Sequence, residues 1–165
     1  MDTRWTDFFV TAGGAAAALT GLLFVAVALR PREIRGSALM LGRARSAFYA
    51  FVTVLLIALL ALSGTASRLI GLAQLAVVAG VLTLSMPFTL AAARIGTLNY
   101  RRAITYHSGL ALVAIAGIMR AVQGVRQPNQ VVLASGALLL LGIALSNSWQ
   151  LVLSHQADDD PEPTD

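Results

Sequence analysis

The stretch FFVTAGGAAAALTGLLFVAVAL, residues 8–29, decides the fold class because it contains no charged residue over a length that can cross a bilayer. A transmembrane helix needs about 20 predominantly apolar residues. The rest of the chain has the same character: 57% of its 165 residues are hydrophobic, 12% are charged and the mean hydropathy is +0.74. The sequence therefore predicts an all-α integral membrane protein, with this stretch as its first span.

Hydropathy predicts four more spans, over about residues 46–63, 69–93, 106–124 and 131–153. The helix that contains the second span is expected to begin near Ser37, because SALMLGRAR has no helix breaker other than Gly42. The third span contains Pro87, where we expect a kink. Residues 1–154 are thus predicted to form a single five-helix transmembrane domain, and the acidic tail, residues 155–165, is predicted to be disordered.

The arginines predict the orientation of these spans. All twelve basic residues are arginine, and most of them lie in two loops: Arg30, Arg32, Arg35, Arg43 and Arg45 in the first, and Arg94, Arg101 and Arg102 in the second. The alternate connections hold Arg68, Arg120 and Arg126. The positive-inside rule places the Arg-rich loops and the C-terminus in the cytoplasm and the N-terminus outside. We accordingly expect anionic lipid near these loops as a partner, and no nucleic acid.

Small residues recur at helical spacing inside the spans and predict where helices pack. The first span carries Gly13, Ala17 and Gly21 on one face, and later spans repeat the pattern with Ala76 and Gly80, and with Gly142 and Ser146. Small side chains let two backbones approach in lipid, where hydrophobic gain is small. We expect this helix-packing seam to join helices of one chain; a seam between identical subunits is the alternative.

Polar residues in the spans give few candidates for chemistry. Most serines and threonines there are expected to bond a carbonyl one turn back or a facing helix, whereas Gln74 and Asn147 are candidates for a polar path. Arg120 is expected to snorkel toward the outer surface, with a buried functional charge as the alternative. Asp7, predicted at the same surface, is its candidate partner in an outer ion pair.

Enzymatic chemistry is not expected. The chain has no cysteine, which excludes disulfides and thiolate sites, and no acidic residue lies inside a span, which argues against a cation-coupled transporter that uses membrane carboxylates. His107 and His155 are expected at the cytoplasmic interface, and without neighbouring ligands at suitable spacing they predict no metal. No nucleophile with its base is recognisable, so we predict neither a catalytic residue nor a cofactor.

The opening WTDFFVTAGGAAAALTGLLFVAVAL, the Arg-rich first loop and the closing SNSWQLVL resemble a family of small bacterial integral membrane proteins with five predicted spans. Some sequences of this kind are labelled modulators of a membrane-bound AAA protease. The resemblance implies a multi-pass protein of the bacterial inner (plasma) membrane and supplies no catalytic or ligand residue. We expect a noncatalytic regulatory or scaffolding subunit for other membrane proteins; the alternative is a small homo-oligomeric channel or pore.

Overall fold

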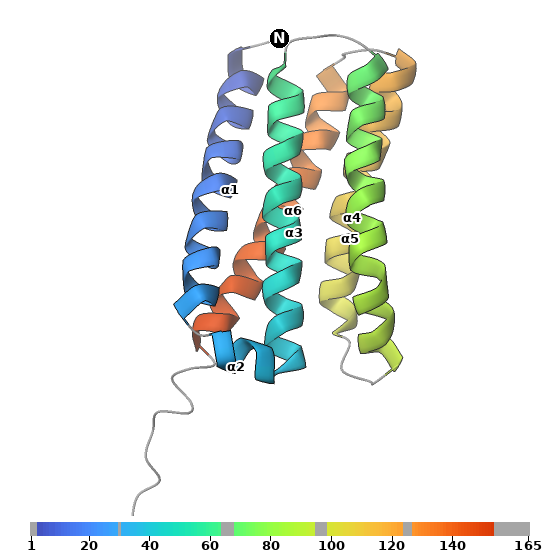
Figure 1. Ribbon diagram of the computed structural model, residues 1–165. Coiled ribbons are helices and arrows are strands. Elements are labelled where there is room, and N and C mark those ends of the chain that lie inside the picture. The colour runs from blue at the N-terminus through green and yellow to red at the C-terminus, as the bar shows by residue number, and fades with distance from the viewer. Residues whose placement is uncertain (1–2, 30, 64–67, 95–98, 124–126, 154–165) are drawn as a thin grey trace, which may run out of the picture.

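The computed structural model describes residues 3–29, 31–63, 68–94, 99–123 and 127–153, which form a bundle of long antiparallel helices (Figure 1). The elements are α1 (Thr3–Leu29), α2 (Pro31–Gly36), α3 (Ala38–Leu62), α4 (Arg68–Arg94), α5 (Tyr100–Gln123) and α6 (Gln127–Leu153). All except α2 contain a stretch long and apolar enough to cross a membrane. The predicted all-α bundle with five candidate spans is therefore confirmed.

The helix boundaries refine the sequence predictions. Helix α3 begins where expected, because Ser37 caps it: the Met40 amide donates to Ser37 Oγ at 3.3 Å. Helix α5 begins at Tyr100, earlier than the predicted fourth span, and α2 forms inside the predicted first loop. Pro87 does not end α4, which continues to Arg94. The tail predicted to be disordered, residues 155–165, lies outside the described residues.

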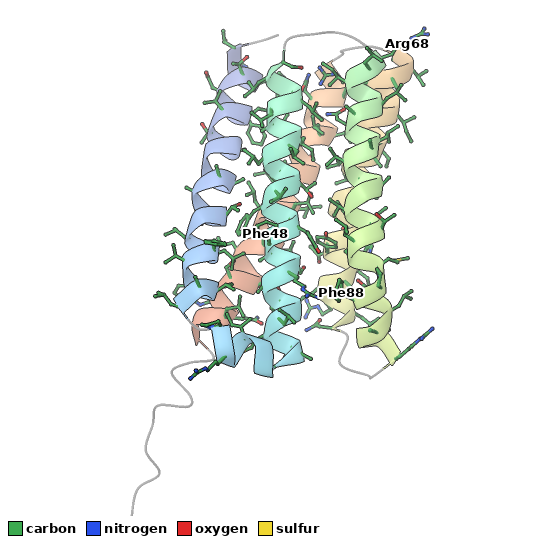
Figure 2. All side chains as sticks on the ribbon, in the orientation of Figure 1. Phe48, Arg68 and Phe88 are labelled. Carbon is green, nitrogen blue, oxygen red and sulfur yellow. The ribbon has the colours of Figure 1, made fainter. Side chains whose placement is uncertain are left out.

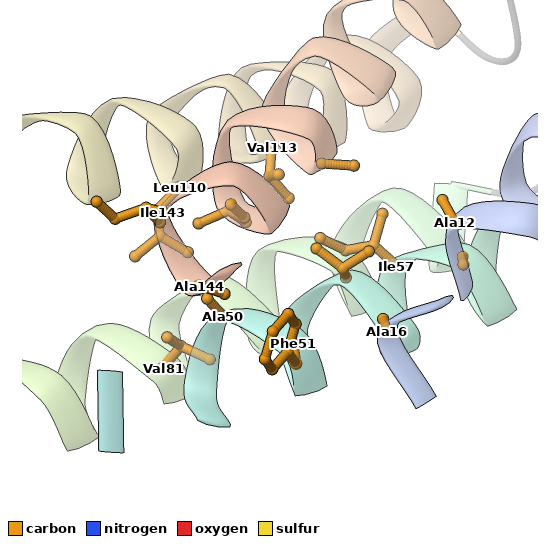
Figure 3. Close-up of a cluster of buried hydrophobic side chains, with 14 of the residues drawn as sticks. Ala12, Ala16, Ala50, Phe51, Ile57, Val81, Leu110, Val113, Ile143 and Ala144 are labelled. Atoms are coloured by element: carbon orange, nitrogen blue, oxygen red, sulfur yellow. The ribbon is translucent and has the colours of Figure 1, made fainter. Parts of the chain in front are cut away.

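Helix α3 lies at the centre of the bundle and contacts α1, α6 and α4, while α5 packs between α4 and α6. Figure 3 shows buried side chains from all five long helices meeting, among them Ala16 of α1, Phe51 of α3, Val81 of α4, Val113 of α5 and Ala144 of α6. Alanine is frequent in this core, which allows the close van der Waals contact that helix association in lipid requires.

The two ends of the bundle differ in charge. Figure 1 shows that α2, the start of α3, the end of α4 and the start of α5 lie at one end, and their residues include Arg43, Arg45, Arg94, Arg101 and Arg102. We call this the arginine-rich end. Arg68, at the start of α4, lies at the opposite end (Figure 2). The bundle thus brings the two predicted Arg-rich loops together, and their cytoplasmic location stays a prediction.

Cysteine labelling in intact cells tests this orientation. Ser63 and Gly36 are both exposed and lie at opposite ends of the bundle, and the parent chain has no cysteine to confuse the assay. A membrane-impermeant maleimide should label Ser63→Cys and should label Gly36→Cys only after the membrane is opened. If Gly36→Cys alone were labelled in intact cells, the orientation would be the reverse of the predicted one.

Candidate ligand cavity at the arginine-rich end

A cavity of about 610 Å³ opens among α3, α4, α5 and α6 at the arginine-rich end. Its volume lies in the range of about 300–1,000 Å³ that is typical of small-molecule sites. Most of its lining is apolar, with Leu39 and Leu41 from α3, Phe88 from α4, Ala103 from α5 and Ile143 from α6. Phe88 lies between α3 and α4 in the lower half of the bundle (Figure 2). The cavity therefore resembles an apolar binding site built between helices.

Three arginines line this cavity: Arg43 and Arg45 on α3, and Arg102 on α5. The Arg45 guanidinium carbon lies 4.4 Å from the centre of the Phe88 ring, a cation–π contact that orients the side chain across the α3–α4 gap. Arg43 on α3 and Arg102 on α5 line the same cavity. Among the residues that the structure describes, none of the lining side chains is acidic. The cavity therefore combines concentrated positive charge with an apolar interior.

Other polar groups add hydrogen-bonding capacity to the cavity. His107 Nδ1 lies 2.7 Å from the Ala103 carbonyl oxygen, and since a carbonyl only accepts, Nδ1 carries the proton. Asn147 Nδ2 donates to Ser46 Oγ at 3.3 Å, a bond between α6 and α3. The buried Tyr106 hydroxyl makes no hydrogen bond of good geometry with the described residues. A ligand could therefore use Tyr106 and the second ring nitrogen of His107.

Gln74 and Asn147, the two candidates for a polar path, lie in different regions. Asn147 lines the cavity and Gln74 does not. About 16 Å of helix separates Gln74 from Ser85, the cavity residue on the same helix, and buried valines, Val78 and Val81, lie between them on α4. Two polar sites at different depths replace the predicted path.

Gln74 belongs to a second group of buried polar side chains, toward the end opposite the arginine-rich one. The other members are Arg120 on α5 and Asn129 and Gln130 on α6, all 5% exposed or less. Both amide atoms of Gln74 lack a hydrogen bond to the described residues. Arg120 is buried rather than snorkelling, which corrects the sequence prediction: its position on the same α5 face as Gly117 and Val113 turns it into the bundle.

The predicted outer ion pair between Asp7 and Arg120 is also corrected. Asp7 is exposed on α1, and α1 packs on α3 and less extensively on α6 and α2. Arg120 faces inward from α5, which packs between α4 and α6. The prediction paired these two residues because both were expected at the outer membrane surface. In the bundle, α1 and α5 are not neighbouring helices, so the two side chains lie apart.

The predicted packing seam divides into one internal residue and six exposed ones. Gly13 is buried at the α1–α3 contact, where a Cβ would lie 2.9 Å from Ala58 Cβ. The other six are exposed and make no seam inside the described bundle: Ala17, Gly21, Ala76, Gly80, Gly142 and Ser146. This corrects the expectation of an intrachain seam for these six. The small-residue pattern identified one face of each helix but not the face that meets a neighbour, so a contact between subunits stays a prediction.

Other glycines make the close contacts. A Cβ at Gly71 of α4 would lie 2.6 Å from the backbone nitrogen of Ala121 on α5. A Cβ at Gly136 of α6 would lie 3.0 Å from the carbonyl oxygen of Gly109 on α5. Sequence reasoning missed these positions, although Gly109 and Gly117 share a face with Tyr106 and Arg120 on α5. Helix α5 is the most amphipathic of the long helices, and this pattern is the signal that could have identified its buried face.

The hydroxyl side chains in the spans behave as predicted. Most of them donate to a carbonyl three or four residues earlier, among them Thr11, Thr20, Thr53, Thr83, Ser85, Thr89 and Ser135. These bonds satisfy the hydroxyl locally, so these residues need no partner on another helix. The polar groups available for a ligand are therefore mainly amide, guanidinium, imidazole and phenol groups.

Comparisons of the chain with protein-family models, with curated proteins and with solved structures gave no match. The resemblance to small five-span bacterial proteins accordingly stays a prediction. The described side chains contain no cluster of three or more histidines or acidic residues that could hold a metal ion. His155 lies outside the described residues.

Proposed function

We propose that this protein is a noncatalytic membrane protein that acts as a helix-packing regulatory or scaffolding subunit for other membrane proteins. The observation that carries the proposal is the outward face of α1. Gly14, Ala17, Ala18 and Gly21 share this face and are all exposed, and a Cβ at Gly14 or Gly21 would meet nothing within 4 Å. A face of this kind lets another helix approach closely.

The position of α1 supports the same proposal. Its opposite face packs on the central helix α3, with Ala12, Ala16 and Leu23 buried. Lipid-facing positions elsewhere carry large side chains such as Leu69, Leu72 and Leu84 on α4. Small residues are also exposed on α4 and α6, at Ala76, Gly80, Gly142 and Ser146, but the small outward residues of α1 lie on the helix that packs mainly on α3 and leaves its other side uncovered. Contact with a second membrane helix would cover this side of α1.

The alternative of a channel or pore receives less support. The cavity and the group around Gln74 are separated by apolar side chains that include Val81, Leu110 and Val113, so the described residues offer no continuous polar route along one chain. A pore between subunits would have to be lined by outward faces, which are mainly apolar. Such a lining opposes ion passage.

Crosslinking in native membranes tests the proposed role of α1. A single cysteine at Ala18 should give one discrete adduct with another membrane protein, and adding Gly21→Leu should abolish the adduct, because leucine holds the two backbones apart. Stability in detergent should not change, because residue 21 faces outward. As a control, a single cysteine at the exposed Ala26, on another side of α1, should give no such adduct.

The mass of the adduct also distinguishes the proposed regulatory or scaffolding role from the channel alternative. A mass of two 17.3 kDa chains would indicate self-association, and a selective ion conductance of the purified protein in liposomes would then favour the channel. An adduct that survives Gly21→Leu would contradict the proposed packing face.

A further inference from the structure

The positive charge of the cavity is a feature of α3 and α5 and is independent of the proposed packing role of α1. Arg43 and Arg45 come from α3, and Arg102 comes from α5, about sixty residues later in the chain. The buried Nε of Arg43 has no hydrogen-bond acceptor among the described residues, and the described lining around Arg45 and Arg102 contains no acidic side chain. Clustered guanidinium groups beside apolar surface are unfavourable unless an anion joins them.

The depth of the arginines indicates where this anion lies. Arg43 is the sixth residue of α3 and Arg102 the third of α5, which puts both within about 10 Å of the ends of their helices. Helix α3 has 25 residues and a length of about 38 Å, against a hydrocarbon core of about 30 Å. The guanidinium groups therefore lie near the boundary between phospholipid headgroups and acyl chains.

The remaining lining is suited to an acyl chain. Apart from the arginines, the cavity wall includes Ala91, Ala103 and Ile143. Leu39 and Phe88, which also line the cavity, are 52% and 45% exposed, so the apolar lining continues onto the outer surface of the bundle. A small soluble anion would use the arginines but would leave this apolar lining without a function.

We propose that the cavity is a binding site for an anionic phospholipid. Its phosphate lies among the guanidinium groups of Arg43, Arg45 and Arg102, which form charge-assisted hydrogen bonds with phosphate oxygens. One acyl chain lies against Phe88 and Ile143, and the hydroxyl of Tyr106, which also lines the cavity, donates to the ester region. The ligand balances the arginines and fills the space where α3 and α4 contact each other less extensively than α4 and α5 do.

Lipid titration of the purified, delipidated full chain tests the site. Native mass spectrometry should show phosphatidylglycerol retained at least about tenfold more tightly than phosphatidylcholine with the same acyl chains. Arg43→Gln and Arg102→Gln should each weaken retention of phosphatidylglycerol about tenfold. Arg101→Gln is the matched control: Arg101 is exposed, adjacent to Arg102 and outside the lining, so retention should not change.

A cavity-filling variant tests the acyl-chain part without altering charge. Ala103→Leu extends into the cavity and should weaken retention of phosphatidylglycerol while helical content and elution volume stay those of the parent. Equal retention of both lipids, or equal loss in Arg101→Gln and Arg102→Gln, would overturn the proposal, since either result indicates general surface attraction. If Arg43→Gln does not fold, the comparison of Arg102 with Arg101 decides.

A soluble ligand is distinguished in the same assay. Inorganic phosphate and glycerol 3-phosphate carry the anionic group without acyl chains. Neither should displace phosphatidylglycerol at concentrations up to a hundredfold above that of the lipid. Displacement by glycerol 3-phosphate at equal concentration would show that the site recognises a soluble phosphate, and the lipid assignment would be wrong.

Discussion

Replacing Gly71 with alanine is expected to lower the free energy of unfolding by about 2–3 kcal/mol, at the upper end of the usual cost of overpacking. The added methyl group would lie 2.6 Å from the Ala121 nitrogen and 2.7 Å from the Gly117 carbonyl oxygen. Both atoms belong to the α5 backbone, so no side-chain rotation relieves the clash and α4 must move away from α5. Reversible unfolding in mixed detergent micelles measures the effect.

Gly80→Ala is the matched control, because Gly80 lies on the same helix and a Cβ there would meet nothing within 4 Å. Alanine is a better helix former than glycine by about 0.5–1 kcal/mol, so this substitution should leave stability unchanged or raise it slightly. Of the two alanine substitutions, only the one at Gly71 is thus expected to destabilise the bundle. Equal effects would show that α4 and α5 do not meet at Gly71.

Replacing Phe51 with alanine is the second large effect, a loss of about 2–3 kcal/mol. Phe51 is 0% exposed at the centre of the core (Figure 3), and truncation of a buried phenylalanine in a water-soluble protein costs about 3–5 kcal/mol. Part of that cost is transfer of the ring from water, and this part disappears where the alternative environment is lipid. The remaining loss is the van der Waals contact of the ring. The same unfolding assay measures it.

Phe24→Ala on α1 is the matched control for Phe51→Ala. Phe24 is 68% exposed and contacts the core little, so its truncation should change stability by less than about 0.5 kcal/mol, as is usual for surface positions. A large loss from Phe24→Ala with none from Phe51→Ala would mean that α1 and α3 present other faces to the core than those described.

Local features of this protein were predictable from sequence because they depend on neighbours along the chain. The start of α3 followed from the capping residue Ser37, and hydroxyl groups such as Thr53 bond the preceding turn of their own helix. The distances involved are set by helix geometry alone. Predictions that depended on contact between two helices were wrong: Asp7 and Arg120 do not meet, and Arg120 faces the interior.

The sequence by itself determined the number and approximate positions of the apolar helices, since the thickness of a bilayer and the need to satisfy backbone hydrogen bonds leave little choice for such stretches. Only the tertiary structure decided which small residues touch: Gly71 and Gly136 do, whereas Gly80 and Gly142 do not. Small residues at helical spacing occur on several faces of these alanine-rich helices, and lipid tails are as apolar as the core, so hydropathy does not distinguish the inner face from the outer one. The same holds for the cavity, whose arginines come from two helices far apart in the chain and converge only when α3, α4 and α5 pack.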